Sequence, residues 1–466
     1  MRRLSILVAL ALAFSSCVFA QGKPSVPDVN AWRDQTVEYL SALVKIDTSN
    51  PPGNEIKAAQ YIQGVLTKEG ITSEIFESAP GRATLVARLK GNGKKKPIML
   101  MAHIDVVGVE YDKWTEKPFA AEIKNGYMYG RGSYDDKAMV AANLSVFVQL
   151  KRMNTPLDRD VIFMAEAGEE GTSQFGVDFM VAKHWDKIDC EYALNEGGEA
   201  EITADGKVPF IGIQTTEKVP RGLQLSAKGT SGHGSMPRID NAIVHLAAAV
   251  AKIGNWQTPM RLNDTTRTFF ANIAKISPPE EAKLYTSLSD PATQEKLRAT
   301  NIFYNSMLRT SIVPTIIKGG FRENVIPADA VATLDVRALP DEDMDKLVAT
   351  LNQMINDPAV TITRLTEGQV RPSAAPSRLD NDMFHAFESA TKKVFPGSLT
   401  IPMMSTGASD AAQLRAKGVQ AYGISVPATA EERKRIHGND ERVIVESLGK
   451  FALFIYASTM EVAGAK

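Results

Sequence analysis

Apolar residues recur along the chain at two different spacings, and together these spacings predict an α/β protein. Helical spacing predicts helices over residues 32–46, 55–69, 138–153 and 447–461. Short runs of aliphatic residues predict strands at 84–89, 98–102, 161–165 and 192–194. Strands that alternate with helices favour a mostly parallel central sheet covered by helices on both faces.

The pattern changes near residue 216. From there the spacings predict, in order, a strand (223–227), a helix (241–253), two strands (312–318 and 331–336), a helix (343–355) and a strand (360–365). This is the order of the ferredoxin-like split unit, interrupted by a mostly helical stretch at 256–309. From about residue 371 helix and strand patterns return. We therefore predict a first domain built from 21–215 and 369–466, with a second, α+β domain inserted at 216–368.

Composition narrows the class of partner. The 466 residues are 44% hydrophobic and 23% charged, and the net charge is −1. No global field therefore favours nucleic acid or an anionic membrane. The run Lys94, Lys95 and Lys96 has no interleaved aromatic residues, so it does not indicate nucleic-acid binding.

The N-terminal segment has the pattern of a signal peptide. Arg2 and Arg3 precede an apolar run over 4–14, and Ala20 ends a cleavage-type sequence. We therefore predict a signal peptide at 1–20, export to the periplasm or medium, and no membrane span in the mature chain, because no other apolar run is long enough. A retained N-terminal anchor and lipidation at Cys17 are the alternatives.

Several short polar motifs carry residues suited to metal binding. They are His103-x-Asp105, Gly130-Arg131-Gly132-x-x-Asp135-Asp136-Lys137, Glu169-Glu170-Gly171, Asn195-Glu196-Gly197-Gly198 and His437. Three of them follow predicted strands, and open α/β sheets bind ligands beyond the carboxyl ends of their strands. Histidines mixed with carboxylates favour Zn²⁺, whereas a set made only of oxygen ligands would favour Mg²⁺ or Ca²⁺.

These motifs resemble those of the dinuclear zinc exopeptidase superfamily, which includes glutamate carboxypeptidase, aminoacylase, carnosinase and succinyl-diaminopimelate desuccinylase. The resemblance extends to residues 231–237 and 324–327 of the inserted domain, and is greatest to the carboxypeptidase S branch. One departure is Ala138, where the family usually has glycine. The resemblance implies an inserted lid or dimerisation domain, often a homodimer, and two Zn²⁺ per chain, with Co²⁺ as a substitute.

The resemblance also implies a role for each motif residue. His103 and Glu196 would bind one zinc, Glu170 and His437 the other, and Asp135 both. Asp105 would orient His103, Glu169 would be the general base, and the Asp135–Asp136 peptide bond would be cis.

Further roles fall on the inserted domain and a late loop. His233 would hold the oxyanion, often from a partner subunit; a turn histidine that caps the helix at Asn241 is the alternative. Arg337 and Asn324 would contact the free carboxylate of the substrate, although Arg337 can instead pair with Asp335 or Asp341. Gly407 lies in a small-residue loop, 405–410, that resembles the substrate loop of the family.

The sequence leaves three functions open. The first is a carboxypeptidase-type enzyme that cleaves a small peptide beside its free carboxylate. An aminoacylase that cleaves N-acyl amino acids would use the same catalytic residues. A non-catalytic zinc-binding or peptide-binding protein would not need the base Glu169, which favours an enzyme. His184, His245 and His385 have no partner motif and are interpreted as surface or packing residues.

Overall fold

The computed structural model describes residues 26–366 and 371–465, so the predicted signal peptide lies outside the described residues. The larger part of the molecule is built on an eight-stranded sheet with the order β1-β2-β6-β3-β7-β17-β8-β16. The neighbours β6, β3, β7 and β17 all run parallel. The strands are β1 (Ser73–Ala79), β2 (Arg82–Leu89), β3 (Ile98–His103), β6 (Val161–Glu166), β7 (Tyr192–Glu196), β8 (Phe210–Glu217), β16 (Leu399–Ser405) and β17 (Gln420–Ile424).

Helices cover both faces of this sheet. Alternate residues of β3 enter different cores: Ile98 and Leu100 pack on one side, and Met99 and Met101 on the other. The first face carries α1 (Val29–Val44), α2 (Glu55–Lys68), α3 (Lys137–Arg152), α12 (Asp382–Val394) and α15 (Val445–Ala463). The second carries α4 (Val177–Lys183), α5 (Trp185–Ile188) and α13 (Ala411–Ala416). Because both faces are buried, the central strands read as continuous apolar runs.

Smaller elements complete this part. A three-stranded sheet with the order β18-β5-β4 lies beside α15. Its strands and the remaining short elements are β4 (Glu122–Lys124), β5 (Tyr127–Tyr129), β18 (Arg442–Ile444), α14 (Ala430–Arg433), η1 (Tyr111–Lys113) and η2 (Ser173–Phe175). None of the helices within 26–366 and 371–465 is long and apolar enough to cross a membrane.

The second part is an antiparallel sheet with the order β12-β14-β10-β15, and β9 pairs with β14. This is the ferredoxin-like arrangement that the element order predicts. Two helices, α6 and α11, pack their apolar residues on one face of it. The elements are β9 (Val219–Pro220), β10 (Leu223–Lys228), β11 (Gly232–His233), α6 (Ala242–Asn255), β12 (Ser311–Gly319), β13 (Val325–Ile326), β14 (Asp329–Ala338), α11 (Met344–Ile355) and β15 (Val360–Arg364).

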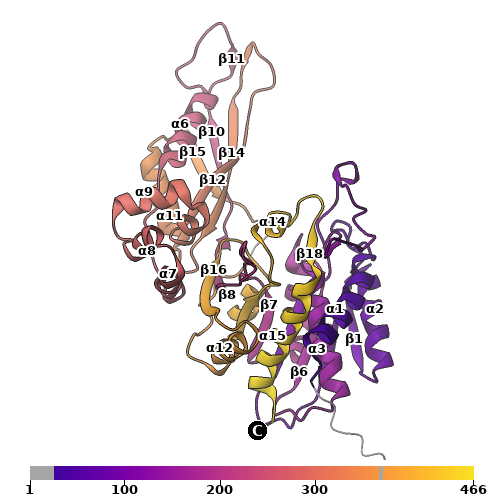
Figure 1. Cartoon of the computed structure of the whole chain (residues 1–466). Coiled ribbons are helices and arrows are strands. Elements are labelled where there is room, and N and C mark those ends of the chain that lie inside the picture. Colours follow the sequence, from indigo (N-terminus) through magenta and orange to yellow (C-terminus); the bar gives the residue numbers. More distant parts are fainter. Residues whose placement is uncertain (1–25, 367–370, 466) are drawn as a thin grey trace, which may run out of the picture.

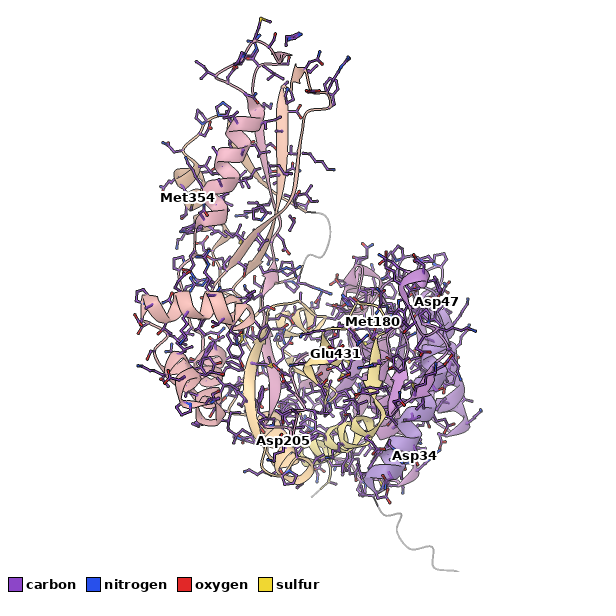
Figure 2. The ribbon with its side chains drawn as sticks, turned by 45° about the horizontal axis from the view of Figure 1, so that its top comes forward. Asp34, Asp47, Met180, Asp205, Met354 and Glu431 are labelled. Atoms are coloured by element: carbon purple, nitrogen blue, oxygen red, sulfur yellow. The ribbon has the colours of Figure 1, made fainter. Side chains whose placement is uncertain are left out.

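Figure 1 shows this smaller sheet standing off the large one, with the short antiparallel pair of β11 and β13 at the end remote from β7. In Figure 2, Met354 of α11 lies in the smaller body, and Asp34, Met180 and Glu431 lie in the larger one. The two parts are joined through the segments that follow β8 and β15.

The stretch between α6 and β12 is mostly helical, as its pattern predicts, and it forms four helices. They are α7 (Asp264–Ile276), α8 (Pro279–Thr286), α9 (Pro291–Thr300) and α10 (Ile302–Met307). Phe269 and Phe270 of α7 share a core with Phe210 of β8 and Met403 of β16. Although these helices fall within the predicted insertion, they pack on the edge of the large sheet.

Candidate metal centre

Three parallel strands bring the first group of functional residues to one edge of the large sheet. His103 ends β3, Glu166 ends β6 and Glu196 ends β7. The loop after β6 carries Glu169 and Glu170. Carboxyl ends of neighbouring parallel strands meet at a common edge, which is where such sheets bind ligands.

Asp135 lies between the two histidines. Its Oδ1 is 3.1 Å from His103 Nε2, and its Oδ2 is 3.2 Å from His437 Nε2. The Asp135–Asp136 peptide bond is cis, as the family resemblance implies. One carboxylate therefore faces two imidazoles with separate oxygens, the arrangement of a bridging ligand.

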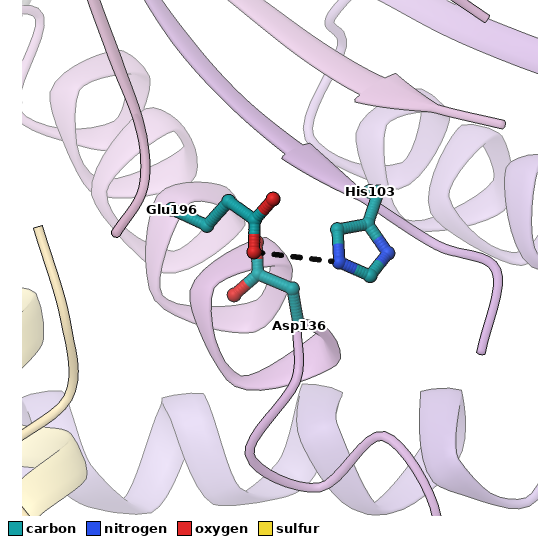
Figure 3. Close-up of side chains that lie close together, drawn as sticks. All are labelled: His103, Asp136 and Glu196. Carbon is teal, nitrogen blue, oxygen red and sulfur yellow. Dashed lines mark ion pairs between the residues drawn. The ribbon is translucent and has the colours of Figure 1, made fainter. Parts of the chain in front are cut away.

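A second carboxylate flanks each histidine. Glu196 Oε2 lies 3.7 Å from His103 Nε2, and Glu170 Oε2 lies 3.0 Å from His437 Nε2. The structure thus brings together the five residues proposed from the motifs as metal ligands. It also places Asp136, which was not among them, beside His103 and Glu196 (Figure 3), with ligand atoms within 4.8 Å of one another.

Asp105 connects His103 to the loop that carries Glu169 and Glu170. His103 Nδ1 lies 3.0 Å from the backbone carbonyl oxygen of Asp105 and 3.5 Å from its carboxylate. That carboxylate accepts the backbone N–H groups of Glu169 and Glu170 at 3.1 and 3.2 Å, and the amide of Asn50 at 2.8 Å. A partner at Nδ1 fixes the ring and leaves Nε2 for a metal.

Two residues whose roles the motifs did not reveal hold the second half of the centre. Glu441 accepts the backbone N–H groups of Tyr134 and Asp135 at 3.0 and 3.1 Å and pairs with Arg131. Arg131 Nη2 donates to the carbonyl oxygens of Gly438 at 2.9 Å and His437 at 3.3 Å. This buried pair therefore ties the Asp135 turn to the His437 loop.

Close backbone approach explains a glycine in the Asp135 turn. Gly132 has φ +78°, and a Cβ there would lie 2.4 Å from Val106 Cγ1. A larger residue would push apart the segments that hold Asp105 and Asp135, so the turn requires glycine.

The concentration of carboxylates shapes the electrostatics. Burial alone would lower the pKa of His103, but Asp105, Asp135 and Glu196 raise it well above its ordinary value. Asp135 and Glu170 raise the pKa of His437 to about 10. Burial and the charge of Asp135 raise the pKa of Glu170 to about 7. The site therefore attracts positive charge strongly.

The donor set fits a pair of divalent cations. Two imidazole nitrogens are mixed with carboxylate oxygens, the combination that suits zinc and neighbouring transition metals. A cavity of about 150 Å³, lined in part by Asp135, Asp136 and Glu196, adjoins these ligands. Asp136 Oδ2 is buried without a hydrogen-bond partner among the described residues. A cation or its water at this position would satisfy that oxygen.

Glu169 lies beside the ligands but contacts an arginine. Arg371 Nη2 donates to Glu169 Oε1 at 2.8 Å, and Arg371 also pairs with Asp410. Burial and the charges of Glu196 and Asp410 raise the pKa of Glu169 well above its ordinary value. Burial and the charge of Asp410 do the same for Glu166. Arg371 was not predicted as a site residue, and Asp410 was predicted only as the last residue of the 405–410 loop.

The residues predicted on the inserted domain do not join this cluster within one chain. His233 is exposed on β11, where it pairs with Val325, and the backbone N–H of Gly234 donates to the carbonyl oxygen of Asn324 at 2.9 Å. His233 Nδ1 accepts the Ser235 N–H at 3.1 Å, whereas Asn241 caps α6 with its own side chain. His233 therefore does not cap that helix.

Arg337 lies near the C-terminal end of β14, opposite Pro220 of β9. Its Nε donates to Asp335 at 2.9 Å, which is one of the pairings expected from the sequence. Gly407 lies in the 405–410 loop, where its N–H donates to Ser405 Oγ at 3.1 Å.

The other histidines lie outside the cluster. The ring of His184 packs against Phe76 and Phe179. His245 pairs with Asp357, and His385 with Glu388.

Comparison with known proteins identifies relatives over most of the chain. The model of peptidase family M20/M25/M40 matches residues 99–461. A probable carboxypeptidase S-like 2 of Dictyostelium discoideum is 29% identical over 385 residues, 80% of this chain and 73% of that protein. The N-fatty-acyl-amino acid synthase/hydrolase PM20D1 of Xenopus tropicalis is 28% identical, covering 89% of this chain and 83% of its own.

The fold has solved counterparts. The crystal structure of the M20 family metallo-carboxypeptidase Sso-CP2 from Sulfolobus solfataricus superposes with a TM-score of 0.66 and 19% identity. The alignment covers 92% of this chain and 99% of that one.

Proposed function

Because the chain belongs to peptidase family M20/M25/M40, we propose that it is a dinuclear zinc carboxypeptidase, which hydrolyses an amide bond beside a free carboxylate. The observation that carries the proposal is the Asp135 carboxylate, shared between two histidine–carboxylate pairs with Glu169 alongside. Membership in the family makes the chain a peptidase or amidohydrolase; the substrate and the metal are the parts proposed.

In this proposal His103 and Glu196 hold one zinc, His437 and Glu170 the other, and Asp135 both. When bound, such a metal pair lowers the pKa of water towards about 7 and polarises the scissile carbonyl. Glu169 accepts the proton of the attacking water and returns it to the leaving nitrogen.

His233 supplies the oxyanion contact from a second copy of the chain. Its strand β11 lies at the end of the inserted domain remote from β7, so His233 serves a site other than its own (Figure 1). Apolar side chains are exposed on α6 and on the edge strand β12: Ile243, Val244, Val313, Ile316 and Ile317. An exposed apolar edge strand invites pairing, and a homodimer through the inserted domain would cover it.

Arg337 binds the free carboxylate of the substrate. Its hydrogen bond to Asp335 uses Nε, so the two terminal nitrogens of the guanidinium are available for a planar carboxylate. Asn324 precedes β13, the strand that pairs with the β11 strand of His233, and would act with His233 from the partner. Gly407 would lie along the substrate because its loop ends at Asp410, the partner of Arg371.

An N-acyl-amino-acid hydrolase is the second candidate. The observation that favours it is the similarity to the PM20D1 protein over 89% of this chain. Both substrates present an amide beside a carboxylate, so the same catalytic residues serve either. We also propose that the protein is exported, on the signal-peptide pattern of residues 1–20.

One experiment tests metal and substrate together. The purified mature protein is analysed for metal. It is then assayed against dipeptides with a free C-terminal carboxylate and against N-acyl amino acids, with and without a chelator. We expect close to two zinc ions per chain, hydrolysis of at least one substrate class, and loss of activity on chelation that zinc or cobalt restores. Absence of divalent metal after reconstitution contradicts the dinuclear centre. Preference for acyl amino acids over dipeptides would select the second candidate.

A further inference from the structure

Arg371 is a buried cation inside the larger part of the molecule. Its side chain is 1% exposed, although it lies where the chain returns from the inserted domain after β15. A buried guanidinium is stable only when carboxylates and further hydrogen bonds replace water. The partners of Arg371 therefore indicate what the residue does.

Both partners are carboxylates: Glu169 is the proposed base, and Asp410 belongs to the 405–410 loop. Arg371 Nη2 donates to Glu169 Oε1 at 2.8 Å, and Nη1 pairs with Asp410 Oδ1. The guanidinium is planar and rigid. The ion pair of Nη1 with Asp410 therefore also fixes the direction in which Nη2 points. Glu169 is then held by one oxygen, and its Oε2 is left for a reacting water.

The same arginine touches both segments that join the two domains. Its backbone carbonyl accepts a hydrogen bond from Arg221 Nη1, at 2.8 Å, in the segment that leads out to the inserted domain. Asp410 closes the 405–410 loop, whose Ser409 Oγ donates to Glu217 Oε2 at 2.7 Å at the end of β8. Arg371 thus links the proposed base to the proposed substrate loop and to the domain junction.

We infer that Arg371 is a positioning residue for Glu169, oriented in turn by Asp410, and that it sets the carboxylate of the base in register with the substrate loop. The inference rests on the proposed function, in which Glu169 is the base. Its physical basis is geometric, since a small displacement of a reacting group costs a large part of the rate. In serine hydrolases a carboxylate orients the histidine base in a comparable way.

A double-mutant cycle tests the inference, with kcat, zinc content and thermal unfolding measured for each protein. The variants are Glu169→Gln, Arg371→Gln and the double substitution. We expect Arg371→Gln to keep zinc and lower kcat by about 10²-fold, the loss expected from a misplaced group. In the Glu169→Gln background the second substitution should cost less than about 3-fold, because residues that act as a unit are not additive.

A conservative pair of variants separates positioning from simple packing. Arg159 is also buried in the larger part, where it pairs with Glu191 and donates to the carbonyl oxygen of Val462. Arg371→Lys keeps the charge but cannot contact Glu169 and Asp410 with two fixed nitrogens, so kcat should fall. The kcat of Arg159→Lys should stay within about 3-fold of the parent value, because Arg159 lies away from a reacting group. Both lysine variants should melt at similar temperatures. They also provide the test if Arg371→Gln does not fold.

The outcomes separate two failures. If Glu169→Gln alone keeps normal turnover, the proposed base is wrong. If Glu169→Gln is inactive but Arg371→Gln lowers kcat by the same factor in both backgrounds, the positioning role is overturned and the base stands. Equal kcat losses in Arg371→Lys and Arg159→Lys would also overturn it.

Discussion

The metal-ligand cluster and the tip of the inserted domain are held in opposite ways. In the cluster, His103 and Asp105 are almost fully buried, and each proposed ligand contacts another described residue. At the tip, His233 is exposed, and the nearby apolar residues Met236, Ile239 and Phe321 are exposed as well.

The degree of burial indicates how each region can act. Buried ion pairs fix side chains in place before any substrate arrives, which is the condition for electrostatic preorganisation. The exposed histidine on β11 has no such constraint, and it becomes positioned only when another surface covers it.

Glu169→Gln should have the largest effect. It preserves the shape of the side chain and removes its ability to accept a proton, so turnover should fall by about 10²–10⁴-fold, the range for a positioned acid–base group. Metal content should stay at the parent level, as measured by elemental analysis. Glu388→Gln on the surface of α12 is the matched control and should change neither turnover nor metal content. Near-normal turnover in Glu169→Gln would require another proton acceptor.

His233→Ala should come next. Loss of an oxyanion donor lowers kcat by about 10²–10³-fold, and KM should move much less because the contact forms mainly in the transition state. Zinc content should not change, and His385→Ala, another exposed histidine, is the control.

Mixing experiments then separate one chain from two. Hybrids of His233→Ala chains with Glu169→Gln chains should recover part of the activity if each site takes its histidine from the partner. An unchanged kcat in His233→Ala would leave this histidine as a turn residue that binds Ser235.

Glu441→Gln sharpens the cluster side of the contrast. Glu441 holds the backbone of Asp135 and, through Arg131, the loop of His437. Substitution of residues that orient metal ligands typically lowers metal affinity by about 10–100-fold. Competition with a chromophoric chelator measures this directly. The control is Asp160→Asn, which removes an ion pair with Arg88 away from the centre. Equal zinc affinity in the two variants would show that the pair is dispensable.

Lys218, which follows β8 at the junction between the two domains, provides a test based on stability instead of turnover. Burial lowers the pKa of Lys218 to about 7, from 10.5. Between these values the unfolded chain carries a proton that the folded chain lacks, so stability rises with pH by up to about 1.4 kcal/mol per unit. Below about pH 7 both states are protonated and the dependence disappears.

The measurement compares the parent with Lys218→Met, which has no titrating group at this position. Urea unfolding from pH 7 to 10 should show the parent gaining stability relative to the variant. Parallel curves over this range would mean that the ammonium stays charged beside Ser306 and Ser311.

The sequence predicted the α/β architecture and the ferredoxin-like order because those depend on local periodicity. The pairs that support the centre have no such signal. Glu441 and Arg131 are 310 positions apart, and Arg371 and Glu169 are 202 apart. A lone buried arginine looks like any surface arginine until its neighbours in space are known.

Several strands of the large sheet were also missed. The bounds of β1, β8, β16 and β17 were not predicted. In the edge strand β1 the residues are partly exposed and the apolar ones are interspersed with glutamates, so the strand pattern is weak. In the proposed dimer, the position of His233 relative to the cluster depends on how the two domains and the two copies assemble. No pattern within one chain encodes that assembly.

The pairing of distant segments has a consequence for biosynthesis. His437 contacts Glu170 across 267 positions, and α15, which packs beside α1, follows it at the end of the chain. The ribosome must therefore synthesise the chain beyond residue 437 before the second half of the proposed metal centre can close. Contacts of such long range slow folding. A polypeptide cut short by a premature stop codon before residue 437 would lack one of the proposed metal ligands, so we expect it to be inactive.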